Sequence, residues 1–330
     1  MTSASSTHQL TTRLVNGLLA IKPIAQFAKH QARTMMIRRA ESIGVPWTQL
    51  AAALKDRRPE VWEAELRQVQ TPDLKYPDYY QRPFHAYETG NLSWEAAMEV
   101  EAAAKAVHAR IWPEAGAQGD ARLRQSYHDV LLAQIPSPPK DILDLGCGVG
   151  MSTFALKSSY PYATITGLDL SPYFLAIAQY RSREQHQSMR WLHRPAEDTQ
   201  CPDQSFDLIS ICLVCHELPR QVTQQIFAEA RRLLRPHGHL ALMDMNPESE
   251  VVRQMPPYAF TLLKSTEPYL DDYFSFNIAE AMVNAGFQPP TLTHNSPRHR
   301  TFIAPRTTPK FDSKPTNDRG HGIGVDWPNC

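Results

Sequence analysis

The sequence Asp141-Ile-Leu-Asp-Leu-Gly-Cys-Gly-Val-Gly150 decides the fold of this chain. An apolar run leads into glycines at alternate positions, Gly146, Gly148 and Gly150. The run predicts a buried parallel strand, and the glycines predict a tight turn into a helix that begins near Met151. Glycine is needed where a Cβ would block the approach of a ligand to the backbone, or where φ is positive. Turns of this kind bind nucleotide-like cofactors at the carboxyl end of an open α/β sheet.

The spacing of the glycines distinguishes between two kinds of cofactor. A dinucleotide site has the pattern G-x-G-x-x-G, with a helix N-terminus directed at a pyrophosphate. Here Met151 stands at the third glycine position, and Asp144 comes just before the first glycine. A carboxylate there would repel a pyrophosphate but attract a positive charge, such as the amino group of an amino acid. The sequence therefore argues against a nicotinamide-dependent oxidoreductase.

A second acidic residue ends the next predicted strand, which covers Ala163 to Leu170. Asp169 follows Gly150 by roughly 20 residues, the interval expected for a carboxylate that binds ribose hydroxyls. Ser171 and Pro172 then predict the start of a helix, with serine as N-cap and proline at the first helical position.

These features resemble motif I of the class I S-adenosylmethionine-dependent methyltransferases, D/E-x-G-x-G-x-G. The resemblance extends over about Leu123 to Ala304. It implies an α/β fold, a seven-stranded Rossmann-like sheet with helices on both faces. Its further parts are an adenine loop at Arg194–Thr199, a fourth strand with a Phe-Asp pair at Phe206–Cys212, a helix, Pro-x-Gly turn and fifth strand over Glu229–Asp244, and closing strands at Gln288–Thr293 and Arg298–Ala304.

The same resemblance implies S-adenosyl-L-methionine as the cofactor. The residues that it places against the cofactor are Asp144, Gly146, Cys147, Gly148, Gly150, Asp169, Leu170, Ala196, Glu197, Asp198 and Cys212. One position departs from the family pattern, because Pro195 stands where an aspartate is common. Glu197 or Asp198 is then left to meet adenine N6, with the backbone of Ala196 near N1.

Methyl transfer from a sulfonium mainly requires that the reactants be held in line. A general base is needed only if the nucleophile arrives protonated. His216, just past the fourth strand, is the first candidate for that base, since imidazole titrates near neutral pH. The alternative is a capping or packing role. Glu217 has a similar position, although stabilisation of its carboxylate by a helix N-terminus would explain that position equally well. Asp244 ends the fifth strand, where it could face the acceptor or bind a backbone amide.

The composition excludes several classes of protein. The chain has 330 residues, 42% hydrophobic and 21% charged, and a formal net charge of zero, so it has no global charge that would favour nucleic acid. It contains no apolar run long enough to span a membrane. Five cysteines form no recognisable disulfide framework, which favours a reducing compartment. Cys212 and Cys215 are expected to be small buried residues, and no metal site is expected.

Four regions are predicted along the chain. Residues 1–12 and 305–330 are polar and expected to be disordered, 13–118 form a helical N-terminal extension or lid, and 119–304 form the methyltransferase domain. The extension contains helical patterns from Arg13 to about Ser42, from Pro59 to Gln70 and from Ser93 to Trp112, with a break at Pro46-Trp47. It resembles an uncharacterised branch of methyltransferase-like proteins from oxygenic phototrophs.

The first helical segment is basic, with Lys22, Lys29 and Arg33 clustered on one face. Three interpretations remain open: a helix docked on the domain with a solvated basic face, an interfacial helix on an anionic membrane, and an organelle-targeting peptide. They correspond to a cytoplasmic protein, peripheral membrane contact, and a plastid protein.

Aromatic segments around Tyr79–Tyr87 and Tyr258–Tyr273 are expected either to build the acceptor pocket or to attach the N-terminal helices. His85, Glu267 and Tyr269 would be the polar groups of that pocket. The leading hypothesis is methyl transfer to a small, lipophilic or aromatic acceptor, as in the distantly similar quinone C-methyltransferases. The alternatives are a protein methyltransferase and a non-catalytic S-adenosylmethionine-binding protein.

Overall fold

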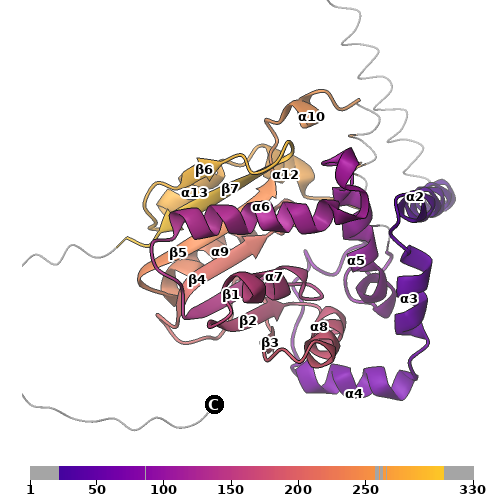
Figure 1. Ribbon diagram of the computed structural model, residues 1–330, viewed down its shortest axis with the longest axis horizontal. Helices are drawn as coiled ribbons and strands as arrows, with labels where there is room; N and C mark the ends of the chain where they lie inside the picture. Colours follow the sequence, from indigo (N-terminus) through magenta and orange to yellow (C-terminus); the bar gives the residue numbers. More distant parts are fainter. Residues whose placement is uncertain (1–21, 86, 257–259, 261–262, 265, 308–330) are drawn as a thin grey trace, which may run out of the picture.

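The computed structural model describes residues 22–85, 87–256, 260, 263–264 and 266–307. Its centre is one seven-stranded sheet with the order β3-β2-β1-β4-β5-β7-β6 (Figure 1). The first five strands along the chain are parallel, and β7 is antiparallel to both β5 and β6. The strands are β1 Asp141–Leu145, β2 Thr164–Asp169, β3 Arg190–His193, β4 Phe206–Cys212, β5 Leu234–Met245, β6 Thr291–Thr293 and β7 His299–Pro305. The predicted fold class is confirmed.

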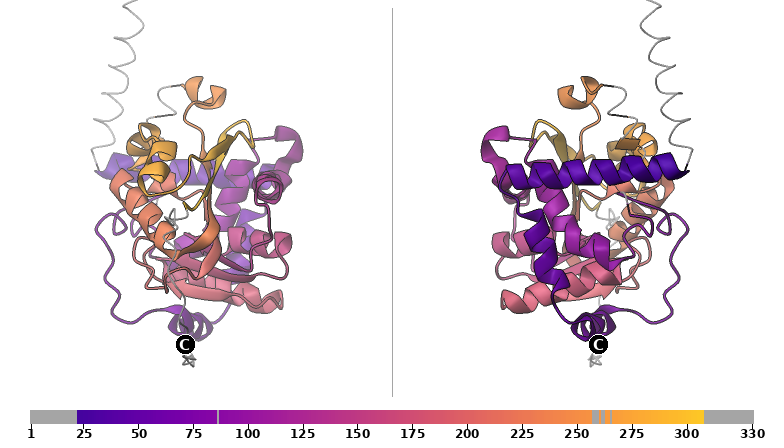
Figure 2. Two further views of the ribbon diagram at one scale, coloured as in Figure 1. Left: turned by 90° about the vertical axis from the view of Figure 1, so that its left-hand side faces the viewer. Right: turned by 90° about the vertical axis from the view of Figure 1, so that its right-hand side faces the viewer.

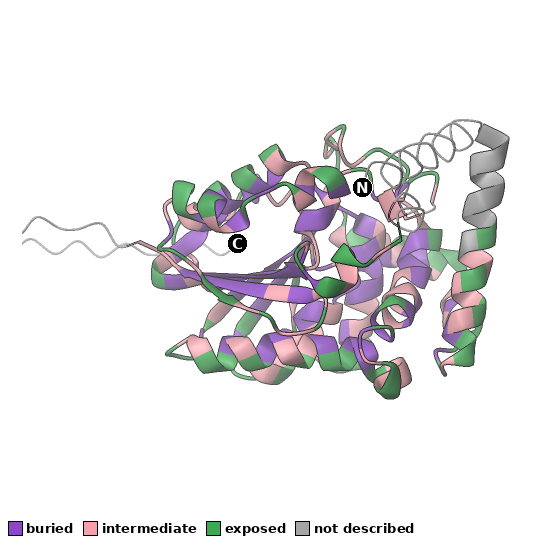
Figure 3. Ribbon diagram, turned by 90° about the horizontal axis from the view of Figure 1, so that it is seen from above, coloured by how far each residue is buried: buried purple, intermediate pink, exposed green. Residues whose placement is uncertain are grey.

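The central strands are buried on both faces, which is why they read as nearly continuous apolar runs. Ile142 and Leu143 on β1 point to opposite faces and are both fully buried. One face packs against α9 Arg220–Leu233 and α13 Ile278–Asn284, and the other packs against α6 Gly119–Gln134 and α7 Met151–Ser159. Figure 3 shows the buried strands between helices whose outer sides are exposed.

The order of the strands locates the site. The connections reverse direction between β1 and β4, and ligands of open α/β sheets bind outside the carboxyl ends of the strands at this point. The helix α8, Pro172–Glu184, begins as predicted, because Ser171 Oγ accepts a hydrogen bond from the backbone N–H of Phe174 and Pro172 occupies the first helical position.

Four N-terminal helices form a layer beside this edge of the sheet (Figures 1 and 2). They are α2 Lys22–Ser42, α3 Trp47–Lys55, α4 Pro59–Val69 and α5 Trp94–His108. The helix α5 contacts α2, α3 and α8, and α4 contacts α8. The predicted break at Pro46 is confirmed, but the chain resumes at once as α3, which the sequence analysis did not predict. The helix α3 is held because Trp47 and Ala51 pack with Ala102 and Ala106 of α5.

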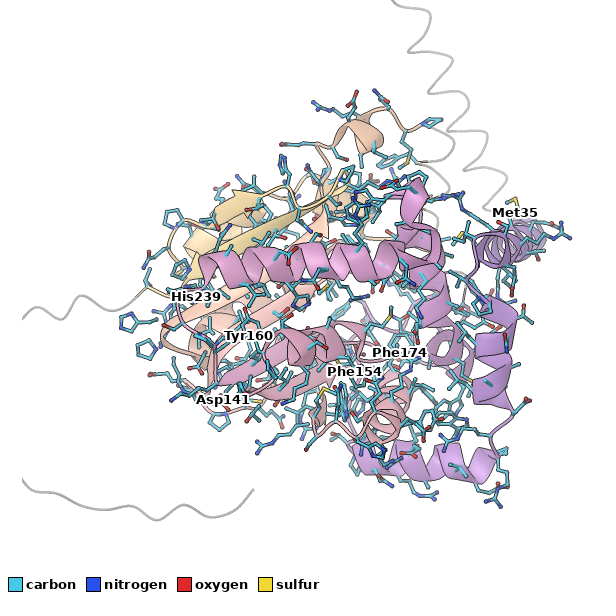
Figure 4. The ribbon with its side chains drawn as sticks, in the orientation of Figure 1. Met35, Asp141, Phe154, Tyr160, Phe174 and His239 are labelled. Carbon is cyan, nitrogen blue, oxygen red and sulfur yellow. The ribbon has the colours of Figure 1, made fainter. Side chains whose placement is uncertain are left out.

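A buried carboxylate joins three of these segments. Glu99 of α5, which is 1% exposed, accepts hydrogen bonds from Arg33 Nε at 3.1 Å and from Tyr87 Oη at 3.0 Å, and Lys55 Nζ lies 3.4 Å away. A buried carboxylate needs such partners to be tolerated. Of the three interpretations of α2, the docked one placed Arg33 on a solvated face; the structure corrects that detail, because the guanidinium pairs with Glu99. The outer side of α2 carries Met35 instead, 60% exposed (Figure 4).

Other boundaries differ from the predictions in detail. The helix α5 ends at His108 rather than Trp112, and Pro113–Gln118 form a 3-10 helix before α6. The predicted tail begins with ordered residues, since Arg306 N donates to Gly238 O. The predictions for residues 1–12 and for the chain after Thr307 lie outside the described residues. Within those described, no helix is both long and apolar enough to span a bilayer.

Candidate functional site

The glycine turn joins β1 to α7 as predicted, and all its glycines have positive φ: 69° at Gly146, 54° at Gly148 and 86° at Gly150. They serve different purposes. A Cβ on Gly146 would lie 2.6 Å from Val214, and one on Gly150 would lie 2.8 Å from Phe154. A Cβ on Gly148 would meet only Phe174, at 3.9 Å, on the wall of a cavity. Gly148 is therefore the glycine whose bare backbone is available to a ligand.

Asp144 lies at the end of β1 and is fully buried. Its Oδ2 accepts hydrogen bonds from Ser152 Oγ and Thr153 Oγ1, each at 2.6 Å, while its Oδ1 is buried without a partner among the described residues. Burial raises the pKa of this carboxyl to about 6, although both hydroxyls oppose the shift. Asp144 does not itself line the cavity described below. A cationic group that reached Oδ1 would compensate the buried charge, as expected of the amino group predicted from the sequence.

Asp169 ends β2 and is also buried. Its Oδ2 accepts the backbone N–H of Gly148 at 2.8 Å, and its Oδ1 accepts that of Ser171 at 2.7 Å. This pairing ties the second carboxylate to the glycine turn. The Tyr80 hydroxyl, from the aromatic loop before α5, donates to the same Oδ1 at 3.4 Å. Burial raises the pKa of Asp169 to about 6.

The loop after β3 carries the three predicted adenine contacts. Ala196 lines the cavity, as does Leu170 after β2. Glu197 Oε1 accepts the Tyr79 hydroxyl at 2.7 Å, and its Oε2 is buried without a partner in the described part of the chain. Neither Glu197 nor Asp198 lines the cavity. Glu197 is partly buried next to Ala196, whereas Asp198 is exposed, so the structure does not bring Asp198 to this site.

The cavity at the carboxyl ends of the strands has a volume of about 1260 Å³. Its walls come from the segments after β1, β2, β3, β4 and β5, from α5, and from the aromatic loop. Sites for one small molecule commonly occupy about 300–1,000 Å³. The space is thus large enough for a cofactor and an acceptor together. Phe174 of α8, labelled in Figure 4, forms part of the wall beside Gly148.

His216 and Asp244 form a buried pair beside this cavity. His216 lies in a 3-10 turn, Cys215–Glu217, after β4, and its Nδ1 is 2.6 Å from Asp244 Oδ1 at the end of β5. Asp244 Oδ2 also accepts the backbone N–H of His216, at 3.2 Å. Asp244 therefore positions His216 and does not itself line the cavity, whereas His216 does. Burial opposes a charge on the imidazole, but Asp244 outweighs it and raises the pKa of His216 to about 10.

Three further titratable groups gather around His216. Glu217 and His85 line the cavity with it, and His85 Nε2 lies 3.8 Å from Glu217 Oε1 and 4.0 Å from Glu267 Oε1. Burial raises the pKa of Glu217 to about 8 and also raises that of Glu267. Burial and the charge of His216 lower the pKa of His85, so its imidazole is neutral near pH 7.

A backbone hydrogen bond holds His85 in the wall of the cavity. Its φ is 52°, and its N–H donates to Thr266 O at 3.0 Å. The two aromatic segments therefore meet here, as the acceptor-pocket hypothesis expected for His85 and Glu267. Tyr269 instead donates from its hydroxyl to Tyr79 O at 3.3 Å, outside the lining of the cavity.

Arg124 of α6 is a site residue that the sequence analysis missed. Its Nε donates to Asp120 Oδ2 at 3.0 Å, and its guanidinium lies 3.8 Å from the sulfur atoms of Cys212 and Met151. It lines the cavity and its positive charge acts on buried Asp144. No motif marks it, because an arginine in an amphipathic helix is ordinarily a surface residue.

The cysteines are not a reactive pair. Cys212 and Cys215 are free and buried, as predicted. Burial raises the pKa of Cys212 to about 12, so it is a neutral thiol in the cavity wall. Among the described residues, no cluster of three histidine, cysteine or acidic side chains could hold a metal ion.

The chain is similar to known methyltransferases over part of its length. Residues 142–238 match the model of a methyltransferase domain. The chain is 31% identical over 144 residues to an uncharacterised methyltransferase of Synechocystis, covering 43% of this chain and 65% of the relative. It is 30% identical over 128 residues to the demethylmenaquinone methyltransferase of Thermus thermophilus, covering 39% and 56%. It thus spans less than two thirds of either relative. A solved methyltransferase of Aquifex aeolicus has 16% identity and a TM-score of 0.45, covering 57% of this chain and 93% of its own.

Residues 142–238 form a methyltransferase domain of the class I S-adenosylmethionine-dependent kind that the glycine turn resembles. S-adenosyl-L-methionine is its cofactor, and the residues present fit it. The backbone at Gly148 is open to a ligand, Asp169 stands beside it, and the unpartnered Oδ1 of Asp144 suits an ammonium group.

Proposed function

We propose that this protein transfers a methyl group from S-adenosyl-L-methionine to a small acceptor in the cavity beside His216. The observation that carries the proposal is that one cavity joins the open backbone of Gly148 to the His216–Asp244 pair. The cofactor supplies a methyl group activated on a sulfonium. The chain supplies binding and orientation, which account for much of the acceleration of such a reaction.

The cofactor half of the cavity has a role for each carboxylate. Asp169 would accept the ribose hydroxyls, and Asp144 would hold the amino group, as their places beside the glycine turn support. Arg124 would pair with the carboxylate of the amino-acid part. Glu197, whose Oε2 is free of described partners, is the better candidate than Asp198 for adenine N6.

The protonation of His216 changes the role proposed for it from the sequence. With a pKa of about 10, it is an imidazolium at neutral pH and cannot serve as the resting general base. Nδ1 is bound to Asp244, which leaves Nε2–H to donate to the acceptor. We therefore propose that His216 stabilises negative charge on an acceptor that reaches the site ionised, such as an acidic hydroxyl or its conjugated carbanion.

A lipophilic acceptor is the finer part of the proposal. Apolar side chains of α5 line the cavity, including Val100 and Val107. Two of the relatives, by name, act on demethylmenaquinone and on fatty acids. The aromatic loop at Tyr79–Tyr80, which closes the cofactor side, supports a small acceptor rather than a protein.

Two measurements test this function. Calorimetry should show binding of S-adenosyl-L-methionine, and a labelled methyl group should appear on quinone precursors or other lipophilic acids in an acceptor screen. His216→Gln should keep cofactor affinity within about threefold, because His216 contacts the acceptor, but should lower kcat. Labelling of proteins alone would favour the protein methyltransferase, and cofactor binding without any turnover would favour the non-catalytic alternative.

Membrane contact and compartment stay predictions. The inward pairing of Arg33 with Glu99 favours a docked α2, which leaves fewer cations for an anionic surface. Co-sedimentation of the full chain with anionic vesicles, compared with zwitterionic vesicles, tests the contact directly.

A further inference from the structure

One part of the apolar surface of α5 lines the cavity, while Ala97, Ala102 and Ala106 pack in the core. Val100, Ala103, Ala104 and Val107 line the cavity, and Val107 is 44% exposed. The lining also includes the apolar side chains of Met36 of α2 and of Val252 and Met255 at and after α10, Glu250–Arg253. Small side chains on a helix leave a channel where larger ones would close it. The cavity therefore continues from the cofactor region as an apolar channel.

Arginines from three separate elements meet at the rim of this channel. Arg110 follows α5 and Arg298 precedes β7, and both line the channel. The same two residues line an adjoining hollow of about 340 Å³ together with Arg39 of α2. Arg298 Nη2 donates to the backbone carbonyl of Arg110, 3.4 Å away, which holds the two segments together.

These charges lack compensation within the described part of the chain. None of the three arginines forms an ion pair with a described aspartate or glutamate, and Arg39 Nε is buried without a hydrogen-bond partner. Burial and the charges of Arg39 and Arg298 lower the pKa of Arg110. Burial and the charge of Arg39 lower that of Arg298. Clustering like charges costs stability unless an anion binds among them.

We propose that the channel binds an amphipathic anion, with its apolar body along α5 and a carboxylate or phosphate group between Arg39, Arg110 and Arg298. Planar guanidinium groups match both oxyanions with paired hydrogen bonds. The channel leads to His216, so this molecule is the acceptor of the proposed methyl transfer, and in that respect the inference rests on the proposed function. It adds that the acceptor carries an anionic group besides its apolar body.

Binding of a defined probe tests the inference without turnover. Dodecyl phosphate, below its micellar concentration, is titrated into the full chain with and without S-adenosylhomocysteine, alongside dodecanol and inorganic phosphate. We expect dodecyl phosphate to bind at least roughly tenfold more tightly than either half alone. Cofactor binding and methyl transfer are measured separately, so failure of the proposed function is distinguishable from failure of this site.

Variants separate the two halves of the site. Arg298→Gln and Arg39→Gln should each weaken dodecyl phosphate binding by roughly tenfold. Arg38→Gln is the matched control, since Arg38 is exposed on the same helix and lines neither hollow. Ala104→Trp should block dodecyl phosphate but leave the weak binding of inorganic phosphate. Removing one of three clustered cations eases their repulsion, so Arg39→Gln should melt no lower than the wild type, whereas a merely structural arginine would lower Tm.

Several outcomes would overturn the inference. If dodecanol bound as tightly as dodecyl phosphate, the arginines would not form an anion site. If inorganic phosphate bound as tightly as dodecyl phosphate, the apolar channel would not contribute to binding. If Arg298→Gln and Arg39→Gln both bound dodecyl phosphate like the wild type, its phosphate group would not bind between these arginines. Binding to phosphatidylglycerol vesicles through these arginines, without binding of monomeric dodecyl phosphate, would assign the cluster to a membrane surface instead of a substrate channel.

Discussion

Replacing Gly148 by alanine separates the cost of a strained backbone from the loss of a ligand site. The φ of Gly148 is 54°, so a residue with a Cβ pays about 1–2 kcal/mol for the left-handed conformation. The new methyl group would meet only Phe174, at 3.9 Å, and so adds no clash within the protein. For a chain of this size, that cost lowers Tm by only a few degrees, about 2 °C for each kcal/mol.

The effect on cofactor binding should be much larger. The methyl group projects into the cavity, where the backbone of Gly148 would otherwise contact the cofactor. An added methyl group in a packed contact costs about 1–3 kcal/mol, which is roughly a 5- to 150-fold loss of affinity. Isothermal titration with S-adenosyl-L-methionine measures the affinity, and thermal unfolding without ligand measures the strain.

Gly44→Ala is the matched control. Gly44 lies between α2 and α3, has a φ of 81°, and has nothing within 4 Å of an added Cβ. The Gly44→Ala variant therefore has a similar backbone strain, but no ligand lies nearby. Its Tm should fall by a similar amount, and its affinity for S-adenosyl-L-methionine should equal that of the wild type. If Gly148→Ala remains folded and binds the cofactor like the wild type, the cofactor does not contact this face of the turn, and the assignment of the site is wrong.

Four further predictions concern ionisable side chains. Asp169→Asn should weaken cofactor binding by roughly tenfold or more, since the charged acceptor for ribose hydroxyls is lost; unchanged affinity by calorimetry would contradict this. Burial raises the pKa values of Asp144 and Asp169 to about 6, and the cofactor needs both ionised, so its affinity should fall as the pH decreases below about 6, measurable by titration at pH 5 and 7.5. The raised pKa of His216 contributes stability that is complete below about pH 6.5 and lost as the pH rises through about 10. Asp244→Asn should abolish that dependence in urea unfolding, and an unaltered profile would argue against the ion pair. Asp207→Ala should cost about 1–2 kcal/mol without changing cofactor affinity, because its carboxylate accepts two backbone N–H groups at the start of β1, at 2.8 and 3.0 Å.

Much of the domain could be predicted from the sequence because its signals are local. The apolar run before Gly146 specified a strand, the glycines specified the turn, and Ser171-Pro172 specified the start of α8. These patterns reflect backbone preferences and burial over a few residues. The helix α3 could not be predicted in this way, because Trp47–Lys55 is helical through packing against α5, which is remote in sequence.

Tertiary structure alone decided the chemistry of the site. The aromatic loop has no periodic pattern, and only folding brings the Tyr79 hydroxyl to Glu197. His216 could be chosen as a candidate from its position after β4, but its charge depends on Asp244, which is 2.6 Å away in space and far along the chain. The pKa of a side chain depends on its burial and on nearby charges, and the adjacent residues in the sequence determine neither. For the same reason, arginines that look like ordinary surface residues converge at the rim of one channel only when the chain has folded.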